Sequence, residues 1–180
     1  MKSAIDCIPC MVGHVLQVSG MVTDCSETRK SIVKAALSRI AAIDFDSSPP
    51  EMARFIHQIV REITGVDDPY RALKDKSTEI ALELLPELEA IVAASDNRFE
   101  TAVRLAIAGN IIDFGADSNF KLSTAKARVL EVLSMPLDLA ALAKLKARMD
   151  TAEKILYLCD NCGEAVIDRL LLRYCRDKVT

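Results

Sequence analysis

A short apolar run near the end of the chain, residues 154–159, does most to limit what this sequence can fold into. Its residues, Lys-Ile-Leu-Tyr-Leu-Cys, are typical of a strand that is buried on both faces of a parallel sheet. A turn at 160–164 and a helical pattern from Ala165 to about Cys175 follow the run. This order gives the first two-thirds of a βαβ unit, whose next strand would start near Val179.

A parallel strand by itself leaves its backbone N–H and C=O groups unpaired, and no other segment is a convincing partner. We therefore expect Ile155–Cys159 to be the one clear strand and to pair with residues beyond 180, with a second chain, or with a partner that the sequence does not reveal. The nearest right-handed partner would begin near residues 178–180. We thus predict a helical region over residues 1–150 and the start of an α/β domain over residues 151–180, in the N-terminal portion of a longer protein.

The rest of the sequence predicts packed helices. Ala, Leu, Ile and Val supply most of its 51% apolar residues, and only eight residues are aromatic, which favours helices over a β-sandwich. The strongest pattern starts at Ser48-Pro49-Pro50-Glu51, ends at Gly65 and carries one apolar stripe: Met52, Phe55, Ile56, Ile59, Val60 and Ile63. Further helices are expected over residues 11–22, 27–42 with Ser26 as N-cap, 68–94 with a kink or interruption at Pro86, 98–108, 123–133 and 137–149.

Composition and charge exclude several classes of function. The net charge of -3 argues against a nucleic-acid binder, and no apolar run approaches the ~18 residues that a membrane span needs. The N-terminus lacks the apolar core of a signal peptide, so we expect a soluble, cytoplasmic protein that binds no membrane. With only two histidines, a His-based catalytic triad is poorly supported, and His57 is interpreted as a surface or packing residue.

Asp160 and Asn161 are the first candidate site. They follow the carboxyl end of the predicted strand, where ligands bind in open α/β sheets. An adjacent carboxylate and amide offer two oxygen ligands to a hard cation such as Mg²⁺ or Mn²⁺, and the next helix N-terminus can bind a phosphate. The alternative is a turn that only caps the helix.

A second candidate follows the helix expected to end at Gly109. Asn110 and Asp113 are polar residues within an apolar stretch, where polar groups need partners. They either face a site or belong to a helix C-cap and the turn after it.

Six cysteines in a reducing compartment point to metal binding or redox chemistry more than to disulfides. Cys7 and Cys10 with His14 could form most of a zinc site, or the two cysteines could simply be buried small residues. Cys159 and Cys162 form a second CxxC pair, which brackets Asp160 and Asn161 and need not converge with the first.

Four motifs occur in one order along nearly the whole chain. They are Cys7-Ile8-Pro9-Cys10, Thr64-Gly65-Val66-Asp67-Asp68-Pro69-Tyr70 with Lys74 after it, Ala108-Gly109-Asn110-Ile111-Ile112-Asp113, and Asp160-Asn161-Cys162-Gly163-Glu164 with Asp168 after it. In these motifs the sequence resembles the archaeal and bacterial branch of the damage-control phosphatases with an ARMT-like metal-binding domain, long catalogued only as a domain of unknown function. The resemblance implies a mainly α N-terminal region leading into a Rossmann-like α/β domain, here incomplete.

The resemblance also implies roles for individual residues. Asp160 and Asn161 would ligate a divalent metal, which is Mn, Ni, Co or Mg, while Asn110, Asp113 and Glu164 would be the catalytic residues of the same pocket. A second cluster of Cys7, Cys10 and Cys162 would lie beside the metal and could hold zinc. The substrate would be a small phosphorylated metabolite, such as a sugar phosphate or a damaged phosphometabolite, and a homo-oligomer is possible.

The chain departs from the family in one respect. The family's third metal carboxylate and its phosphate-binding Lys lie further downstream than residue 180, so we expect the 180 residues alone to hold metal weakly. A zinc-stabilised helical interaction module without catalysis, and a helical scaffold without chemistry, remain alternatives.

Overall fold

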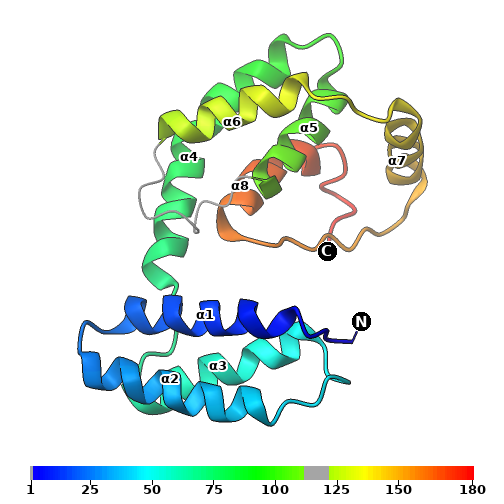
Figure 1. Cartoon of the computed structure of the whole chain (residues 1–180). Helices are drawn as coiled ribbons and strands as arrows, with labels where there is room; N and C mark the ends of the chain where they lie inside the picture. The colour runs from blue at the N-terminus through cyan, green and yellow to red at the C-terminus, as the bar shows by residue number, and fades with distance from the viewer. Residues whose placement is uncertain (1, 112–121) are drawn as a thin grey trace. The chain divides into compact units, whose positions relative to one another are not determined.

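The structure, a computed structural model, describes residues 2–111 and 122–180, without the side chains of residues 111 and 122–125. Over these residues the chain forms eight α-helices, α1 to α8, and divides into two compact units, Met1–Arg71 and Ala72–Thr180 (Figure 1). Each unit has its own hydrophobic core. None of the helices described is long and apolar enough to cross a membrane.

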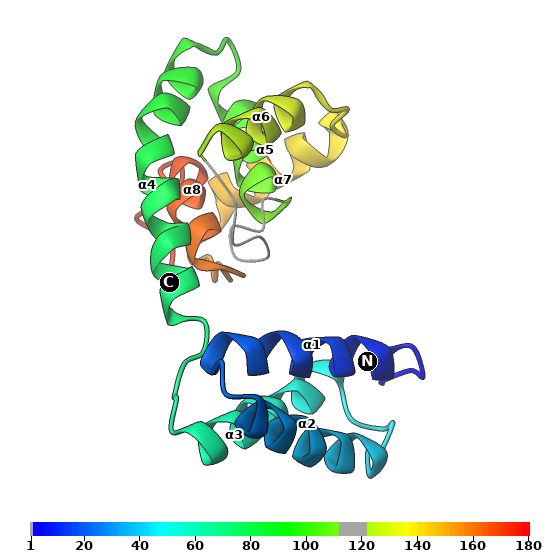
Figure 2. The ribbon, with the colours of Figure 1, turned by 60° about the vertical axis from the view of Figure 1, so that its left-hand side comes forward.

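The first unit consists of three helices, α1 (Cys7–Val22), α2 (Ser26–Ala41) and α3 (Pro49–Thr64), each of which packs against the other two (Figure 2). Each helix contributes three buried residues spaced three or four positions apart, which places them on one face of the helix. They are Met11, Val15 and Val18, then Ile32, Ala36 and Ile40, then Met52, Ile56 and Val60.

Helix α3 confirms the strongest sequence prediction. Its N-terminus is held by Glu51, whose Oε2 accepts hydrogen bonds from the Ser48 N–H at 2.8 Å and the Ser48 hydroxyl at 2.7 Å. Gly65 ends the helix in the left-handed conformation, with φ 73°, and donates its N–H to the Arg61 carbonyl. Of the predicted stripe only Ile63, in the last turn, is exposed.

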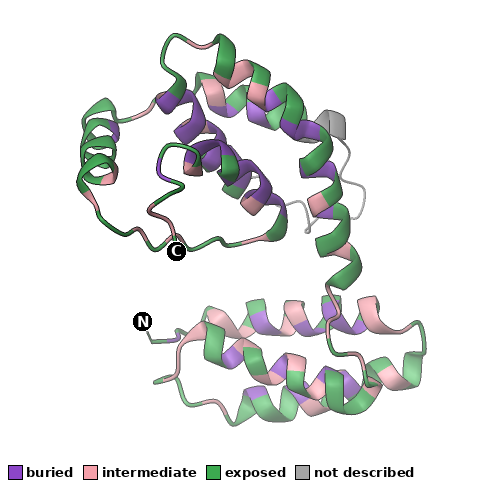
Figure 3. Cartoon of the chain, turned by 180° about the vertical axis from the view of Figure 1, so that it is seen from behind, coloured by how far each residue is buried: buried purple, intermediate pink, exposed green. Residues whose placement is uncertain are grey.

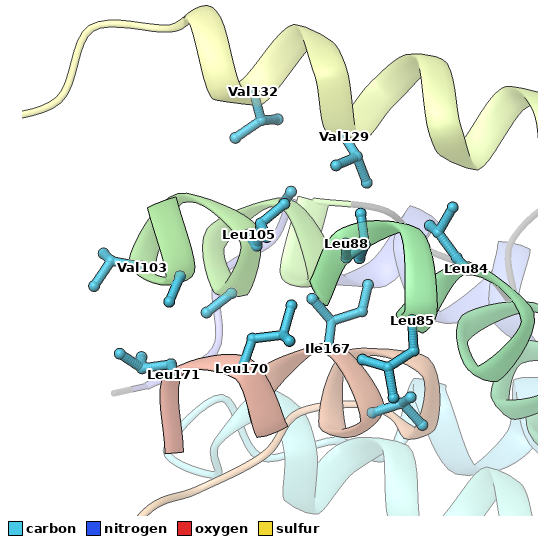
Figure 4. Close-up of a cluster of buried hydrophobic side chains, with 14 of the residues drawn as sticks. Leu84, Leu85, Leu88, Val103, Leu105, Val129, Val132, Ile167, Leu170 and Leu171 are labelled. Carbon is cyan, nitrogen blue, oxygen red and sulfur yellow. The ribbon is translucent and has the colours of Figure 1, made fainter. Parts of the chain in front are cut away.

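The second unit contains α4 (Arg71–Ala94), α5 (Arg98–Ile111), α6 (Leu122–Ser134), α7 (Leu139–Thr151) and α8 (Cys162–Leu172). Helix α5 packs against both α6 and α8, and buried residues concentrate in α5 and α8 (Figure 3). Figure 4 shows the resulting core, in which α4 contributes Leu84, Leu85 and Leu88, α5 contributes Val103 and Leu105, α6 contributes Val129 and Val132, and α8 contributes Ile167, Leu170 and Leu171.

Several predicted helix ends need correction. Helix α5 continues past Gly109 to Ile111, and α8 begins at Cys162 and not at Ala165. Helix α4 runs through Pro86 without interruption. Leu85 and Leu88, on either side of this proline, are buried in the core, and their packing outweighs the backbone hydrogen bond that proline cannot make.

The predicted strand Ile155–Cys159 is wrong for this structure, which contains no strand within the described residues. Ile155 forms a single parallel bridge with Val179: its N–H donates to the Lys178 carbonyl at 2.8 Å, and its carbonyl accepts from the Thr180 N–H at 2.9 Å. This bridge lies where the nearest partner was expected to begin, near residues 178–180, while pairing with residues beyond 180 or with a second chain stays a prediction. Two hydrogen bonds do not make a sheet, so the Rossmann-like α/β part is not seen, and the boundary at residue 150 stays a prediction.

Candidate functional site

Asn161 is the N-cap of α8. Its backbone is extended, with φ -134° and ψ 166°, and its side-chain Oδ1 accepts a hydrogen bond from the Glu164 N–H at 2.8 Å. The preceding residue, Asp160, is exposed. Capping uses one of the two lone pairs of the amide oxygen, which leaves the other available to a cation. The capping turn and the cation site, which were alternatives from sequence, are therefore compatible.

Glu164 joins two segments that lie far apart in sequence. Its Oε2 accepts a hydrogen bond from the Asn161 Nδ2 at 3.1 Å and another from the Asn110 Nδ2 at 3.0 Å. Its side chain is buried, with 6% exposure for the residue. The structure thus brings together three of the predicted site residues, Asn110, Asn161 and Glu164, around one carboxylate. Asp113, another predicted site residue, lies outside the described residues.

Asn110 reaches this carboxylate because α5 and α8 approach closely at Gly109. A Cβ atom added at Gly109 would lie 3.4 Å from the Ile167 Cβ and 3.5 Å from the Glu164 Cα. The expectation that this glycine ends a helix is therefore wrong. It lies inside the last turn of α5, where its lack of a side chain lets α8 come near.

We expect Gly109→Ala to leave the free energy of unfolding unchanged or slightly higher, because a methyl group fits at ordinary contact distance and glycine is the poorer helix former by about 1 kcal/mol. Gly109→Val should lower it by about 1–3 kcal/mol, because the larger side chain must displace Ile167 or Glu164. Urea unfolding measures both. The control is Gly13→Val in α1, where nothing lies within 4 Å of an added Cβ. Equal effects of valine at positions 13 and 109 would contradict the close approach.

Asp168 lies one helical turn after Glu164 and is fully buried, with 0% exposure. Neither of its carboxylate oxygens has a hydrogen-bond partner among the described groups. Burial raises the pKa of this carboxyl to about 6, the Tyr157 hydroxyl lowers it, and the Glu164 charge raises it further. Asp168 was noted in sequence only as part of a motif. The available signal was a second acidic residue at a four-residue spacing within an apolar helix.

The negative charges of Asp168 and Glu164 also affect two residues just before Asp160, Tyr157 and Cys159. Burial raises the pKa of Tyr157, and the Asp168 carboxylate beside it raises that pKa further. The pKa of the Cys159 thiol is also raised, by burial and then by the negative charges of Asp168 and Glu164. Anionic forms of either side chain are therefore disfavoured next to Asp168.

The cysteines lie in both units. Cys7 and Cys10 are in the first turn of α1, in the first unit, while Cys162 is the first residue of α8, in the second. All are free thiols, and their predicted clustering stays a prediction. Within residues 2–111 and 122–180, no three His, Cys, Asp or Glu side chains form a group that could hold a metal ion.

His14 is consequently not seen in a zinc site with Cys7 and Cys10. Its Nε2 lies 2.8 Å from the Tyr70 hydroxyl, and its ring meets that of His57 edge-on at 5.3 Å between centroids. The His57 ring also contacts Tyr70, at 5.8 Å, which confirms His57 as a packing residue.

The donors at the start of α8 fit a hard divalent cation in their chemistry. Asp160 is an exposed carboxylate, and the Asn161 amide oxygen is held in place by its cap to Glu164. Oxygen ligands of this kind suit Mg²⁺ and Mn²⁺ better than soft ions. Two protein oxygens leave further coordination positions to water, substrate or other carboxylates.

Comparison with known proteins gives a consistent result along the chain. The damage-control phosphatase ARMT1-like domain matches residues 3–179. The sequence is 33% identical, over 96% of this chain and 60% of the relative, to a protein of Archaeoglobus fulgidus named damage-control phosphatase. It is 29% identical, over 98% of this chain and 60% of the relative, to a damage-control phosphatase of Pyrococcus horikoshii.

The fold matches as well. The crystal structure of a DUF89 family protein from Pyrococcus horikoshii superposes with a TM-score of 0.84 at 28% sequence identity. The match covers 99% of this chain and 61% of that one. The chain therefore spans about 60% of the length of these relatives.

Proposed function

The chain belongs to the damage-control phosphatase ARMT1-like domain family, and from this premise we propose that its protein is a metal-dependent phosphohydrolase of small phosphomonoesters. Sugar phosphates and damaged phosphometabolites are the proposed substrate class. Relatives named damage-control phosphatases support the reaction. The observation that carries the proposal is the exposed Asp160 next to the fixed amide of Asn161, at the N-terminal end of a helix.

Asp160 and Asn161 would hold the divalent cation. The two residues are neighbours in sequence, and the Asn161 amide cannot rotate without losing its hydrogen bonds to Glu164. A bound divalent cation would supply Lewis-acid stabilisation of the negative charge that develops on a phosphoryl group. Mn, Ni, Co and Mg remain the candidate metals.

The first turn of α8 would bind the phosphate. The first turn of any helix carries N–H groups without intrahelical partners, and its positive end favours an anion. The Glu164 N–H already donates to the Asn161 side chain. The phosphate would therefore bind the backbone N–H groups of the helix residues before Glu164.

Glu164 was predicted to be catalytic, but its surroundings suit a positioning residue. Its carboxylate is buried and accepts hydrogen bonds from the Asn110 and Asn161 amides on a single oxygen. We propose that it fixes the Asn161 side chain so that the amide oxygen faces the cation. Asn110 then contributes through Glu164, and the catalytic role of Asp113 stays a prediction from the resemblance.

Metal removal tests the proposed function. Full-length protein treated with EDTA should release no phosphate from p-nitrophenyl phosphate, and Mn²⁺, Ni²⁺, Co²⁺ or Mg²⁺ should restore the release. A panel of sugar phosphates, assayed with the best metal, would then define the substrate. Hydrolysis that survives chelation, or no hydrolysis with any of these metals, would refute the proposal. Tightly held zinc without hydrolysis would favour the interaction module instead.

A further inference from the structure

An open pocket on the surface of the first unit lies beside the connection between α1 and α2. Its volume is about 390 Å³, which is within the range of small-ligand sites. Two apolar and four charged residues are among those that line it: Leu16, Val33, Asp24, Arg29, Lys30 and Lys34. None of these residues belongs to the candidate metal site or to the cysteine motifs, so the proposed function leaves the pocket unexplained.

Leu16 and Val33 form the apolar part of the pocket. Val33 packs against the core of the first unit, which fixes this part of the wall. Leu16 is 49% exposed, although the helix that carries it packs directly against α2. A single exposed leucine is ordinary on a protein surface, so the charges around it decide what the pocket can bind.

Three cations border this apolar part, and two of them lack a counter-ion. Lys30 forms an ion pair with Glu27 at 2.7 Å. The side chains of Arg29 and Lys34 form neither an ion pair nor a hydrogen bond with any residue that the structure describes. Asp24, a carboxylate in the lining, is not ion-paired with either of them. Two uncompensated positive charges at the rim of a pocket attract an anion.

Arg29 is held in position by the neighbouring helix. A Cβ atom added at Gly20 of α1 would lie 3.5 Å from the Arg29 Nη2 and 3.8 Å from its Cζ. The guanidinium therefore lies against the backbone of α1, where glycine leaves room for it. A side chain that is already packed loses less conformational freedom on binding, and the planar guanidinium presents two parallel N–H groups to the oxygens of an anion.

We propose that this pocket binds a phosphomonoester with a short apolar substituent: the phosphate contacts Arg29 and Lys34, and the substituent covers Leu16 and Val33. A phosphomonoester carries close to two negative charges at neutral pH, which matches the two cations without a counter-ion. A single carboxylate would leave one of these cations uncompensated. The proposal does not rest on the proposed function, because binding in this pocket requires no metal and no residue of α8.

Hexylphosphonate is the probe for the full-length protein, because a phosphohydrolase does not cleave its C–P bond. Its binding is followed in ¹H–¹⁵N spectra of EDTA-treated protein, so that no metal draws the phosphonate to the candidate metal site. The variant Asp160→Ala is titrated in the same way. Methylphosphonate, which lacks the apolar part, and 1-hexanol, which lacks the charge, are the matched probes.

Hexylphosphonate should bind with a sub-millimolar Kd and shift the amide signals of Leu16, Arg29 and Lys34. Arg29→Gln and Lys34→Gln should each weaken its binding about tenfold, because a hydrogen bond between charged groups is lost. Leu16→Ser should reduce the affinity for hexylphosphonate towards that for methylphosphonate. The controls Arg54→Gln and Ile63→Ser replace an exposed cation and an exposed apolar residue of α3, outside the lining of the pocket, and should bind like the wild type.

Three results would overturn the proposal. Equal affinities for hexylphosphonate and methylphosphonate would mean that the apolar wall is not used, and equal affinities for hexylphosphonate and 1-hexanol would mean that the cations are not used. Binding that is lost in Asp160→Ala but kept in Arg29→Gln would place the probe at the candidate metal site. A protein that hydrolyses no phosphomonoester with any metal would refute the proposed function and leave the titrations to decide on the pocket.

Discussion

Replacing Asp160 by alanine should lower the metal-dependent kcat/KM of the full-length protein at least about a hundredfold. Loss of an oxygen ligand from a catalytic cation removes several kcal/mol of transition-state stabilisation, and each 1.4 kcal/mol corresponds to a factor of about ten in rate. The free energy of unfolding should stay within about 0.5 kcal/mol of wild type, because Asp160 is exposed and contributes nothing to the core. Steady-state kinetics in Mn²⁺ and urea unfolding measure the two effects.

The matched control for Asp160→Ala is Asp177→Ala in the same unit. The Asp177 side chain is 95% exposed and forms a surface ion pair with Arg176, so its removal should affect neither activity nor stability. Asn161→Ala should differ from both, because it loses the helix cap as well as a proposed metal ligand, and loss of the cap should cost about 1 kcal/mol of stability. Wild-type hydrolysis by Asp160→Ala would show that the metal is held elsewhere.

Helix α3 of the first unit was predictable because its signals are local. The start of α3 is set by Ser48 and Glu51 within four residues, its end by Gly65, and its buried face by a regular apolar spacing. None of these signals depends on a distant part of the chain. The same local rule failed at Gly109, where a glycine marks the close approach of another helix and not a helix end.

The region around residues 155–180 was less predictable because its outcome depends on partners. An apolar run such as 154–159 becomes a strand only if neighbouring strands pair with it, and the single bridge between Ile155 and Val179 does not suffice. The exposed Leu156 and Leu158 show that the apolar pattern does not ensure burial. Sequence placed the nearest possible partner near residue 179, because a right-handed crossover of this length returns there, but it predicted the pairing itself beyond residue 180 or with a second chain.

The sequence predicted which residues form the candidate site, but not the hydrogen bonds between their side chains. Sequence singled out Asn110, Asn161 and Glu164, yet only the packing of α5 on α8 shows that two amides meet on the Glu164 carboxylate. Asp168 was not predicted as a site residue, because a single charged residue in a helical pattern does not indicate burial. Its four-residue spacing from Glu164 predicts a shared face, and the burial of that face follows from tertiary packing.

Asp168 should also make the stability of the protein depend on pH. Its pKa is raised from an ordinary value of 3.8 to about 6 in the folded protein, so the folded state binds a proton more tightly than the unfolded state does. Its contribution to stability is therefore most favourable below pH 3.8, declines as the pH rises towards 6, and stays unfavourable above that. A shift of this size corresponds to a penalty on the order of 2–3 kcal/mol at neutral pH.

Asp168→Asn removes this penalty, and we expect it to be more stable than the wild type by about 2–3 kcal/mol at pH 7–8. The difference should shrink as the pH falls through 6 and should vanish near pH 4, where the wild-type carboxyl is protonated in the folded state. Urea unfolding of both proteins across pH 4–8 measures it, with Asp177→Asn as the exposed control. A difference that is constant with pH, or a less stable Asp168→Asn, would mean that the folded protein pairs this carboxylate with a donor or a cation. Such a partner would have to come from outside the residues described here, because no group among them bonds to either oxygen.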